Sequence, residues 1–232
     1  MSEDLENSDH YGRATAALVA DAVADGMQNG VLLMRHSART FDRSIHDLLN
    51  PLTDHGRRLC RQLGDALPKA FSVRGFASPP ERCMETAQIV IDAHAAAGGA
   101  GGRTRPVEAL GVFYALDQQK MWKGLMAAEG LPDYVGQWFA GEVPTDAMMP
   151  AEVAVEMILR VLGAKLDAAQ TSEGACSLDL CVTHDMTVYT MRHGVGLESV
   201  AGPEVEFLDG LLLYEKDGER MMRSQHGGVV RV

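Results

Sequence analysis

The chain has 232 residues and a formal net charge of −11, because 32 Asp and Glu outnumber 21 Lys and Arg. This length suits one α/β domain or at most two small ones, and the 46% of hydrophobic residues argue against global disorder. The excess of acidic groups excludes general binding to nucleic acid or to an anionic membrane, since most of the surface repels phosphates.

Basic residues are concentrated in one part of this acidic chain. Residues 35–82 hold nine basic against five acidic side chains, and most of the basic ones are Arg. The guanidinium group is a planar fork of donors that suits phosphate or carboxylate. We therefore expect a local anion site here, although an Arg-rich composition without local purpose gives the same count.

The N-terminal residues and the cysteines bear on where the protein works. Residues 1–10 contain four acidic and no basic residues, which predicts a mobile acidic tail rather than a secretory signal. No apolar run approaches the roughly 18 residues of a membrane span. The four cysteines form no Cys-x-x-Cys pair, so we expect a reduced, cytoplasmic protein; a disulfide between Cys176 and Cys181 is the alternative.

The first predicted strand ends at two polar residues. A short Ala-rich helix over residues 12–25 leads into residues 31–34, a continuous apolar run typical of a central strand in a parallel sheet. This strand stops at Arg35 and His36. Open α/β sheets bind their ligands at the carboxyl ends of such strands.

A helix, a strand and a second helix are predicted next. Thr53 is the expected N-cap of a helix whose leucines recur at every fourth residue over 59–67. Residues 73–77 form the second predicted strand, which ends at Ser78, and a helix then runs to about residue 96. One face of that helix is expected to carry Cys83, Ala87, Val90 and Ile91. Residues 95–102 are rich in Ala and Gly and predict a flexible connection.

The middle of the chain is predicted to be helical. Residues 103–150 indicate two or three short helices, around 121–122 and 134–139, which we interpret as a variable cap segment over the ligand site. A long amphipathic helix follows over residues 150–169. Its apolar side is expected to carry Val153, Met157, Val161 and Leu166.

The last part of the chain supplies another strand and a hairpin. Residues 178–182 predict a strand that runs into His184 and Asp185, followed by a further helix. Residues 211–223 suggest a closing β-hairpin. Strands that alternate with helices indicate a three-layer α/β/α sandwich with a mostly parallel central sheet, formed by residues 11–232 as one domain.

Three strand ends therefore deliver polar groups, which converge if the strands lie side by side. These ends carry Arg35 and His36, the segment 78–82, and His184 with Asp185. Arginines bind the dianion of a phosphate monoester, and a neutral imidazole nitrogen attacks phosphorus in line. The pattern indicates phosphoryl transfer through a phosphohistidine, which divides one hard displacement into two easier ones.

Four motifs in this order resemble those of the histidine phosphatase superfamily, the phosphoglycerate-mutase-like proteins. Residues 33–39 resemble its Arg-His-Gly signature, with Ser37 in place of the Gly, and residues 52–56 resemble its Leu-Thr-x-x-Gly element. Residues 78–87 are similar to its Ser-Pro-x-x-Arg…Glu-Thr-Ala helix start, and residues 182–185 are similar to its late His motif. The resemblance implies a phosphoglycerate-mutase-like fold.

The resemblance also implies a role for each matching residue. His36 is the nucleophile that accepts the phosphoryl group. Arg35 and Arg82 hold the phosphoryl oxygens, and His184 donates to the same oxygens. Arg39 resembles the additional arginine of the acid-phosphatase branch and completes the phosphate clamp.

The identity of the general acid is open between two carboxylates. Asp185 resembles the His-Asp pair of the acid-phosphatase branch, in which the acid protonates the leaving alcohol. Glu108 is the nearest candidate for the Glu that does this in the mutase branch, but the Trp-Glu-Gly environment usual downstream is absent. We favour Asp185, whose pKa must then be raised by burial or by its neighbours. Ser37 departs from the pattern, and its small side chain offers a hydroxyl that can donate to phosphate.

The function implied is that of a metal-independent phosphomonoesterase without a cofactor. The histidines outside the motifs match no metal-ligand spacing. The expected partner is a small phosphorylated substrate or a phosphoprotein. Two alternatives stay open: a mutase-type phosphotransferase that passes the group to a second alcohol, and a non-catalytic, phosphate-binding regulatory protein.

Overall fold

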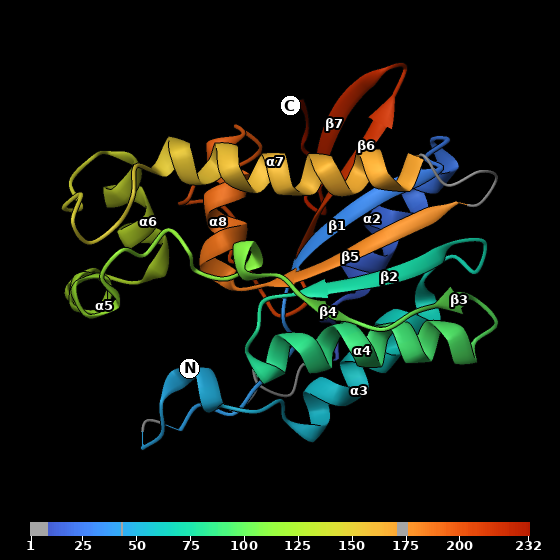
Figure 1. Cartoon of the computed structure of the whole chain (residues 1–232), viewed down its shortest axis with the longest axis horizontal. Coiled ribbons are helices and arrows are strands. Elements are labelled where there is room, and N and C mark those ends of the chain that lie inside the picture. The colour runs from blue at the N-terminus through green and yellow to red at the C-terminus, as the bar shows by residue number, and fades with distance from the viewer. Residues whose placement is uncertain (1–8, 43, 171–175) are drawn as a thin grey trace.

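An eight-stranded sheet forms the centre of the structure (Figure 1). The computed structural model describes residues 9–42, 44–170 and 176–232, so residues 1–8 of the predicted tail lie outside the described residues. The strand order is β3-β2-β5-β1-β6-β7-β8, and β4 also pairs with β2. The strands are β1 (Asn29–Arg35), β2 (Ser72–Ala77), β3 (Ala100–Gly101), β4 (Arg105–Pro106), β5 (Ser177–Thr183), β6 (Gly210–Lys216), β7 (Glu219–Ser224) and β8 (Val229–Arg231).

The middle of the sheet is parallel and one side of it is antiparallel. β1 and β2 both pair in parallel with β5, which lies between them. β6, β7 and β8 continue the sheet beyond β1 in antiparallel pairs. Every residue of β5 is buried, as a central strand covered on both faces requires. The predicted central strands and the closing hairpin are confirmed.

Helices cover both faces of the sheet, so the fold is the predicted three-layer α/β/α sandwich (Figure 1). They are α2 (Arg13–Ala24), α3 (Asp54–Ala66), α4 (Glu81–Ala96), α5 (Gln118–Ala127), α6 (Leu131–Phe139), α7 (Ala151–Gln170) and α8 (Asp185–Gly194), with short 3-10 helices η1 (Asp47–Leu49) and η2 (Glu108–Leu110). Alternate residues of β1 serve the two layers, because successive side chains of a strand point to opposite faces. Leu32 and Met34 pack with α2, α3 and α4, whereas Val31 and Leu33 pack with α6, α7 and α8.

Two expectations about the helices and their connections are wrong. Within the segment 95–102, which was expected to be a flexible connection, Ala100 and Gly101 form β3 and pair with β2. On α7, Val153 and Met157 are 41% and 43% exposed and do not face the core. The buried side of α7 is instead Ala151, Ala154, Val155, Ile158, Leu162, Leu166 and Ala169. The helix carries two apolar stripes, and of the predicted residues Leu166 lies on the stripe that is buried.

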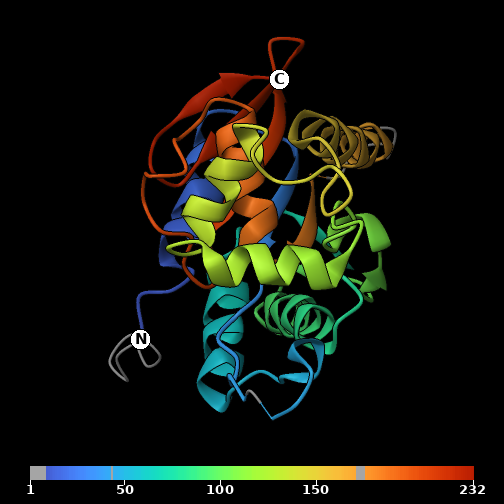
Figure 2. The same cartoon turned by 90° about the vertical axis from the view of Figure 1, so that its left-hand side faces the viewer.

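The segment 103–150 contains η2, α5 and α6. Figure 2, which looks from the left-hand side of Figure 1, shows α5 and α6 in front, beyond the ends of β2 and β5. Its role as a cap stays a prediction.

Within the described residues, no helix combines the length and the apolar character needed to cross a membrane. Cys176 and Cys181 are free thiols, so the alternative disulfide between them is not formed.

The start of α3 approaches the loop that follows β1. Thr53 is the N-cap, as predicted, and its hydroxyl accepts a hydrogen bond from the Gly56 main-chain N at 2.9 Å. A Cβ at Gly56 would lie 2.1 Å from the Ala38 carbonyl oxygen. The Gly56 carbonyl accepts a hydrogen bond from Ser37 Oγ at 2.9 Å. The Leu-Thr-x-x-Gly element therefore holds this loop in place.

We predict that Gly56→Ala lowers the free energy of unfolding by about 1–3 kcal/mol, because its methyl group meets main-chain atoms that cannot turn aside. The midpoint of urea denaturation measures the change. Gly102→Ala is the matched control, since nothing lies within 4 Å of its Cβ position. A Gly56→Ala variant as stable as the control would show that the close approach to Ala38 is unimportant.

Candidate active site

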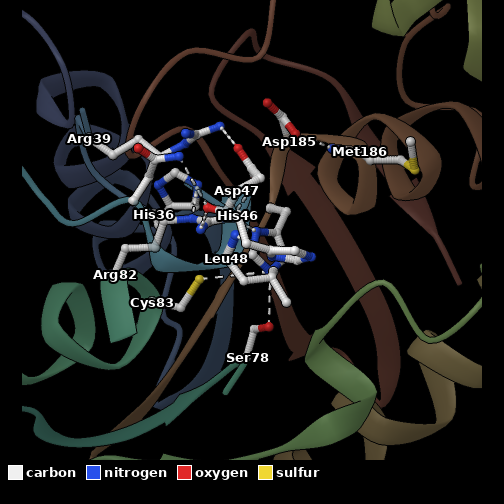
Figure 3. Close-up of polar contacts among 12 residues, drawn as sticks. His36, Arg39, His46, Asp47, Leu48, Ser78, Arg82, Cys83, Asp185 and Met186 are labelled. Carbon is white, nitrogen blue, oxygen red and sulfur yellow. Dashed lines mark hydrogen bonds and ion pairs between the residues drawn. The ribbon is translucent and has the colours of Figure 1, made fainter. Parts of the chain in front are cut away.

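The carboxyl ends of β1, β5 and β2 bring the predicted residues together at what we call the carboxyl edge of the sheet (Figure 3). His36 follows β1, and its main-chain N donates to the carbonyl of Thr183 at 2.9 Å. Ser78 follows β2, and its main-chain N donates to the carbonyl of Val182, also at 2.9 Å. Parallel pairing thus continues past the strands and sets these residues beside His184, which follows β5.

His36 is held as a neutral ring with one nitrogen available. The residue is 3% exposed, and its Nδ1 lies 2.8 Å from the Ser37 carbonyl oxygen, which can only accept. Nδ1 therefore carries the proton, and Nε2 accepts a hydrogen bond from Arg82 Nε at 3.1 Å. Burial lowers the pKa of His36 well below its usual value, and His184, Arg35 and Arg82 lower it further. A neutral imidazole with its lone pair on Nε2 is the nucleophilic form.

Arg82 is buried in the first turn of α4, where the positive end of the helix disfavours a cation. Its Nη1 donates to the main-chain carbonyl of Asp47 at 2.8 Å, and its Nη2 lies 3.2 Å from the Asp47 carboxylate. Arg39 Nη2 lies 2.8 Å from the other oxygen of that carboxylate. Figure 3 shows Asp47 between these two arginines, both of which were predicted to hold phosphate.

His184 precedes α8 as its N-cap residue and faces His36, with 5.6 Å between the ring centroids. Its Nδ1 lies 3.5 Å from Arg82 Nη2, which can only donate, so Nε2 carries the proton and donates to Ser78 Oγ at 2.9 Å. Burial lowers the pKa of His184 to about 4, and the charge of Arg82 acts in the same direction. A bound phosphate would raise this pKa again, because an adjacent anion favours the charged imidazole.

Arg35 is paired with Asp185 rather than free at the site. Its Nη2 lies 2.9 Å from the Asp185 carboxylate, and its Nη1 donates to the Val205 carbonyl at 2.7 Å. The guanidinium carbon lies 4.3 Å from the centre of the Phe207 ring. Burial raises the pKa of Asp185, but the charges of Arg35 and His184 outweigh it, so the pKa lies below its usual value. While it is paired with Arg35, Asp185 therefore lacks the raised pKa that a general acid needs.

Glu108 lies at the same edge of the sheet. It begins η2, directly after β4, whose Pro106 is paired with Ala77 at the end of β2. η2 is tied to β5 by a hydrogen bond of 2.6 Å from Thr183 Oγ1 to the Leu110 carbonyl. Glu108 itself is exposed. The structure therefore brings both candidate acids to the carboxyl edge.

Three contributions to the site were not foreseen from the sequence. Asp47 enters the sequence analysis only as one of the five acids within residues 35–82, and Phe207 belongs to none of the four motifs. Ser37 was expected to offer its hydroxyl to phosphate, but that hydroxyl is buried and donates to Gly56. No signal in the sequence singles out Asp47, because Asp42 and Asp54 lie in the same Arg-rich segment.

These contacts gather three arginines around a neutral imidazole. Arg35, Arg39 and Arg82 supply fixed positive charge, and His36 Nε2 supplies an electron pair. His184 contributes a second imidazole, 5.6 Å from His36 between ring centroids. Fold and site together describe an α/β protein with two buried histidines and three arginines at the carboxyl edge of its sheet.

A comparison with protein families identifies the family to which the chain belongs. A family model described as the histidine phosphatase superfamily (branch 1) matches residues 31–198. The chain belongs to this superfamily, as the four motifs predicted. No curated protein sequence matches the chain.

Solved structures share the fold. Phosphoglycerate mutase from Bacillus anthracis str. Sterne has a TM-score of 0.55 and 19% identity, over 86% of this chain and 94% of that chain. Bacillus stearothermophilus YhfR has a TM-score of 0.56 and 18% identity, over 82% and 93%. A phosphoserine phosphatase mutant from Entamoeba histolytica in complex with phosphoserine has a TM-score of 0.53 and 15% identity, over 84% and 95%. At these identities the likeness shows the fold alone.

The low pKa of His184 predicts a stability that rises with pH between about 4 and 6.5. In that window the unfolded chain binds a proton that the folded chain excludes, so a falling pH favours unfolding. We expect this group to contribute a slope of about 1.4 kcal/mol per pH unit near pH 5. Urea unfolding at pH 7, 6 and 5 measures it.

The controls for this slope are two histidine variants. His184→Gln should lose only its own share of the slope, because burial also lowers the pKa of His36, which contributes with the same sign. His226→Gln, which removes an exposed histidine, should keep the full slope. If His184→Gln and the wild type lose stability in parallel on acidification, then His184 is not held neutral in the folded protein.

Proposed function

We propose that the protein is a metal-independent phosphomonoesterase that works through a phosphohistidine at His36. The observation that carries the proposal is the buried, neutral His36 ring, whose unprotonated Nε2 lies 3.1 Å from Arg82 Nε in a site that also contains Arg35 and Arg39. A nucleophile and its phosphate-holding cations thus lie together. Burial keeps the nitrogen unprotonated at neutral pH without a separate base.

The reaction proceeds in two displacements. A substrate phosphate binds to Arg35, Arg39 and Arg82, and Nε2 of His36 attacks phosphorus while the bond to the leaving oxygen breaks. The leaving oxygen keeps the electron pair and takes a proton from the general acid, which yields a free alcohol and phosphohistidine. Water then attacks phosphorus and returns a proton to the acid, Nε2 departs with its electron pair, and inorganic phosphate is released. A protonated His184 stabilises the negative charge in both steps.

The setting and partners are part of the same proposal. Metal independence belongs to the proposal because the unprotonated His36 Nε2 can attack phosphorus without a metal-activated water. We infer a cytoplasmic protein, supported by four free cysteines, and a small phosphorylated substrate or a phosphoprotein as its partner. Nucleic acid and membrane partners are disfavoured by the charge of −11.

We expect the purified protein to hydrolyse 4-nitrophenyl phosphate at an unchanged rate in the presence of a chelator. His36→Ala should lower kcat/KM by at least about a thousandfold, because no other group replaces the nucleophile. His226→Ala is the matched control and should retain activity. Rapid acid quench and mass spectrometry should detect a phosphoryl adduct in the wild type and none in His36→Ala.

Each competing reaction has its own outcome in that experiment. Loss of activity with chelator would contradict the mechanism and indicate a metal enzyme. Phosphate binding without turnover of any monoester would indicate the non-catalytic regulatory protein. Transfer to added glycerol in preference to water would indicate the mutase-type phosphotransferase.

We further propose that Asp185 becomes the general acid when phosphate binds. A phosphate on Arg35 competes with the Asp185 carboxylate for the same guanidinium, which now lies 2.9 Å away. It also adds negative charge beside the carboxylate, and both effects raise the pKa of Asp185. The substrate itself would thus protonate the acid that its leaving group requires. Glu108 is the competitor because it lies at the same edge without an ion pair of this kind.

Leaving groups of different basicity distinguish the two carboxylates. With phenyl phosphate, whose leaving group needs a proton, Asp185→Asn should lower kcat/KM about 10²–10⁴-fold, and with 2,4-dinitrophenyl phosphate only a few-fold. Glu108→Gln should affect both substrates alike and slightly. The reverse pattern would assign the acid to Glu108.

A further inference from the structure

Among the described residues, Asp47 is the one acidic residue whose carboxylate bridges two arginines of the predicted phosphate clamp, whereas Asp185 pairs with Arg35 alone. One carboxylate oxygen lies 2.8 Å from Arg39 Nη2 and the other lies 3.2 Å from Arg82 Nη2. The Asp47 carbonyl also accepts from Arg82 Nη1 at 2.8 Å. The two carboxylate oxygens of Asp47 thus face two different arginines. Two oxygens of a phosphoryl group would bind the same arginines in the same way.

The occupied clamp is not ready for catalysis. With its Nη atoms on Asp47, Arg82 directs Nε at His36 Nε2, the atom that must attack phosphorus. A phosphoryl group therefore needs two changes. It must take the guanidinium groups from the Asp47 carboxylate, and it must replace Arg82 Nε at the lone pair of His36.

Few contacts hold the chain around Asp47 in place, so the carboxylate can move away from the arginines. We call residues 44–50 the Asp47 segment. It carries η1, a helix of three residues, and the Asp47 side chain is 40% exposed. Its neighbours Leu48 and Leu49 are 42% and 70% exposed, so neither is part of the buried core. Asn50 is the buried member and holds the end of the segment through contacts with Asp42. The ion pairs to Arg39 and Arg82 are thus the main contacts that keep the carboxylate in place.

We propose that Asp47 is an internal competitor of the substrate: its carboxylate occupies the phosphate subsite of the free protein and leaves when a phosphoryl group binds. The proposal rests on the proposed function only in taking this subsite as the place where phosphate binds. The segment acts as a self-inhibiting contact. It reduces the apparent affinity for every phosphate ligand by the same factor, the fraction of molecules whose clamp is open.

Calorimetric titration with two ligands that are not turned over tests this, namely inorganic phosphate and phenylphosphonate. Asp47→Asn and Asp47→Ala should each lower the Kd of both ligands by a common factor of about five to ten. Asp54→Asn is the matched control, because it removes the same charge from a side chain that is 92% exposed and paired with Arg57 instead. Its Kd values should stay within about twofold of the wild type.

Three results would overturn the proposal. Weaker binding in the Asp47 variants would show that Asp47 positions the arginines for phosphate. Unequal factors for the two ligands would show that Asp47 contacts the bound ligand. Unchanged binding, or an equal effect of Asp54→Asn, would show that the contact does not compete at all.

These titrations separate the inference from the proposed function when they are set beside the turnover assay of the protein with His36 intact, because neither ligand is hydrolysed. Tighter binding on loss of Asp47 in a protein that hydrolyses no monoester would uphold the competitor and refute the phosphatase. Chelator-resistant turnover with no gain in affinity on loss of Asp47 would uphold the phosphatase and refute the competitor. In an active protein, the KM of the Asp47 variants for 4-nitrophenyl phosphate should fall by the factor that the titrations give.

Discussion

The hydrogen bond from His36 Nδ1 to the Ser37 carbonyl oxygen is the contact on which the rest of the site depends. It places the ring proton on Nδ1 and leaves the lone pair of Nε2 directed at the arginines. Arg35 and Arg82 then have two effects at once. They supply the positive charge that the proposed phosphate dianion requires, and they add to the effect of burial, which lowers the pKa of His36 and keeps the ring unprotonated. The same charges would repel a protonated ring, so the clamp and the nucleophile require each other.

The parallel sheet makes this arrangement possible because it brings distant parts of the chain to one edge. β1, β5 and β2 are neighbours in space, although β5 comes about a hundred residues after β2 in the chain. Main-chain hydrogen bonds continue past the strand ends and fix the positions of His36 and Ser78. Gly56 adds a third constraint, since its missing side chain allows α3 to lie against the loop after β1. The positions of the reacting groups are therefore set by main-chain pairing more than by side-chain contacts.

The features that could be predicted from the sequence are those fixed by residues close together in the chain. The apolar run of β1, the Thr53 cap and the leucines of α3 depend on neighbouring residues, and the structure confirms all three. The buried side of α7 could not be predicted, because Val153 and Ile158 lie on two different apolar stripes and only the sheet selects between them. Arg35, Arg39, Arg82 and the two histidines follow motifs and converge as expected. Asp47 and Phe207 lie on loops whose path is decided by contacts far away in the sequence.

The buried Arg82 explains why the proposed phosphate site contains an acidic residue. A guanidinium that is 3% exposed at the positive end of a helix costs several kcal/mol if it is left without a counter-ion. A protein that binds phosphate reversibly faces this cost whenever its site is empty. The Asp47 carboxylate offsets it with one negative charge, while a phosphate monoester brings up to two charges and more acceptor oxygens. A single carboxylate is thus strong enough to stabilise the empty clamp and weak enough to be displaced. The chain as a whole is acidic, yet the charge that matters at this site is the balance between one aspartate and the arginines around it.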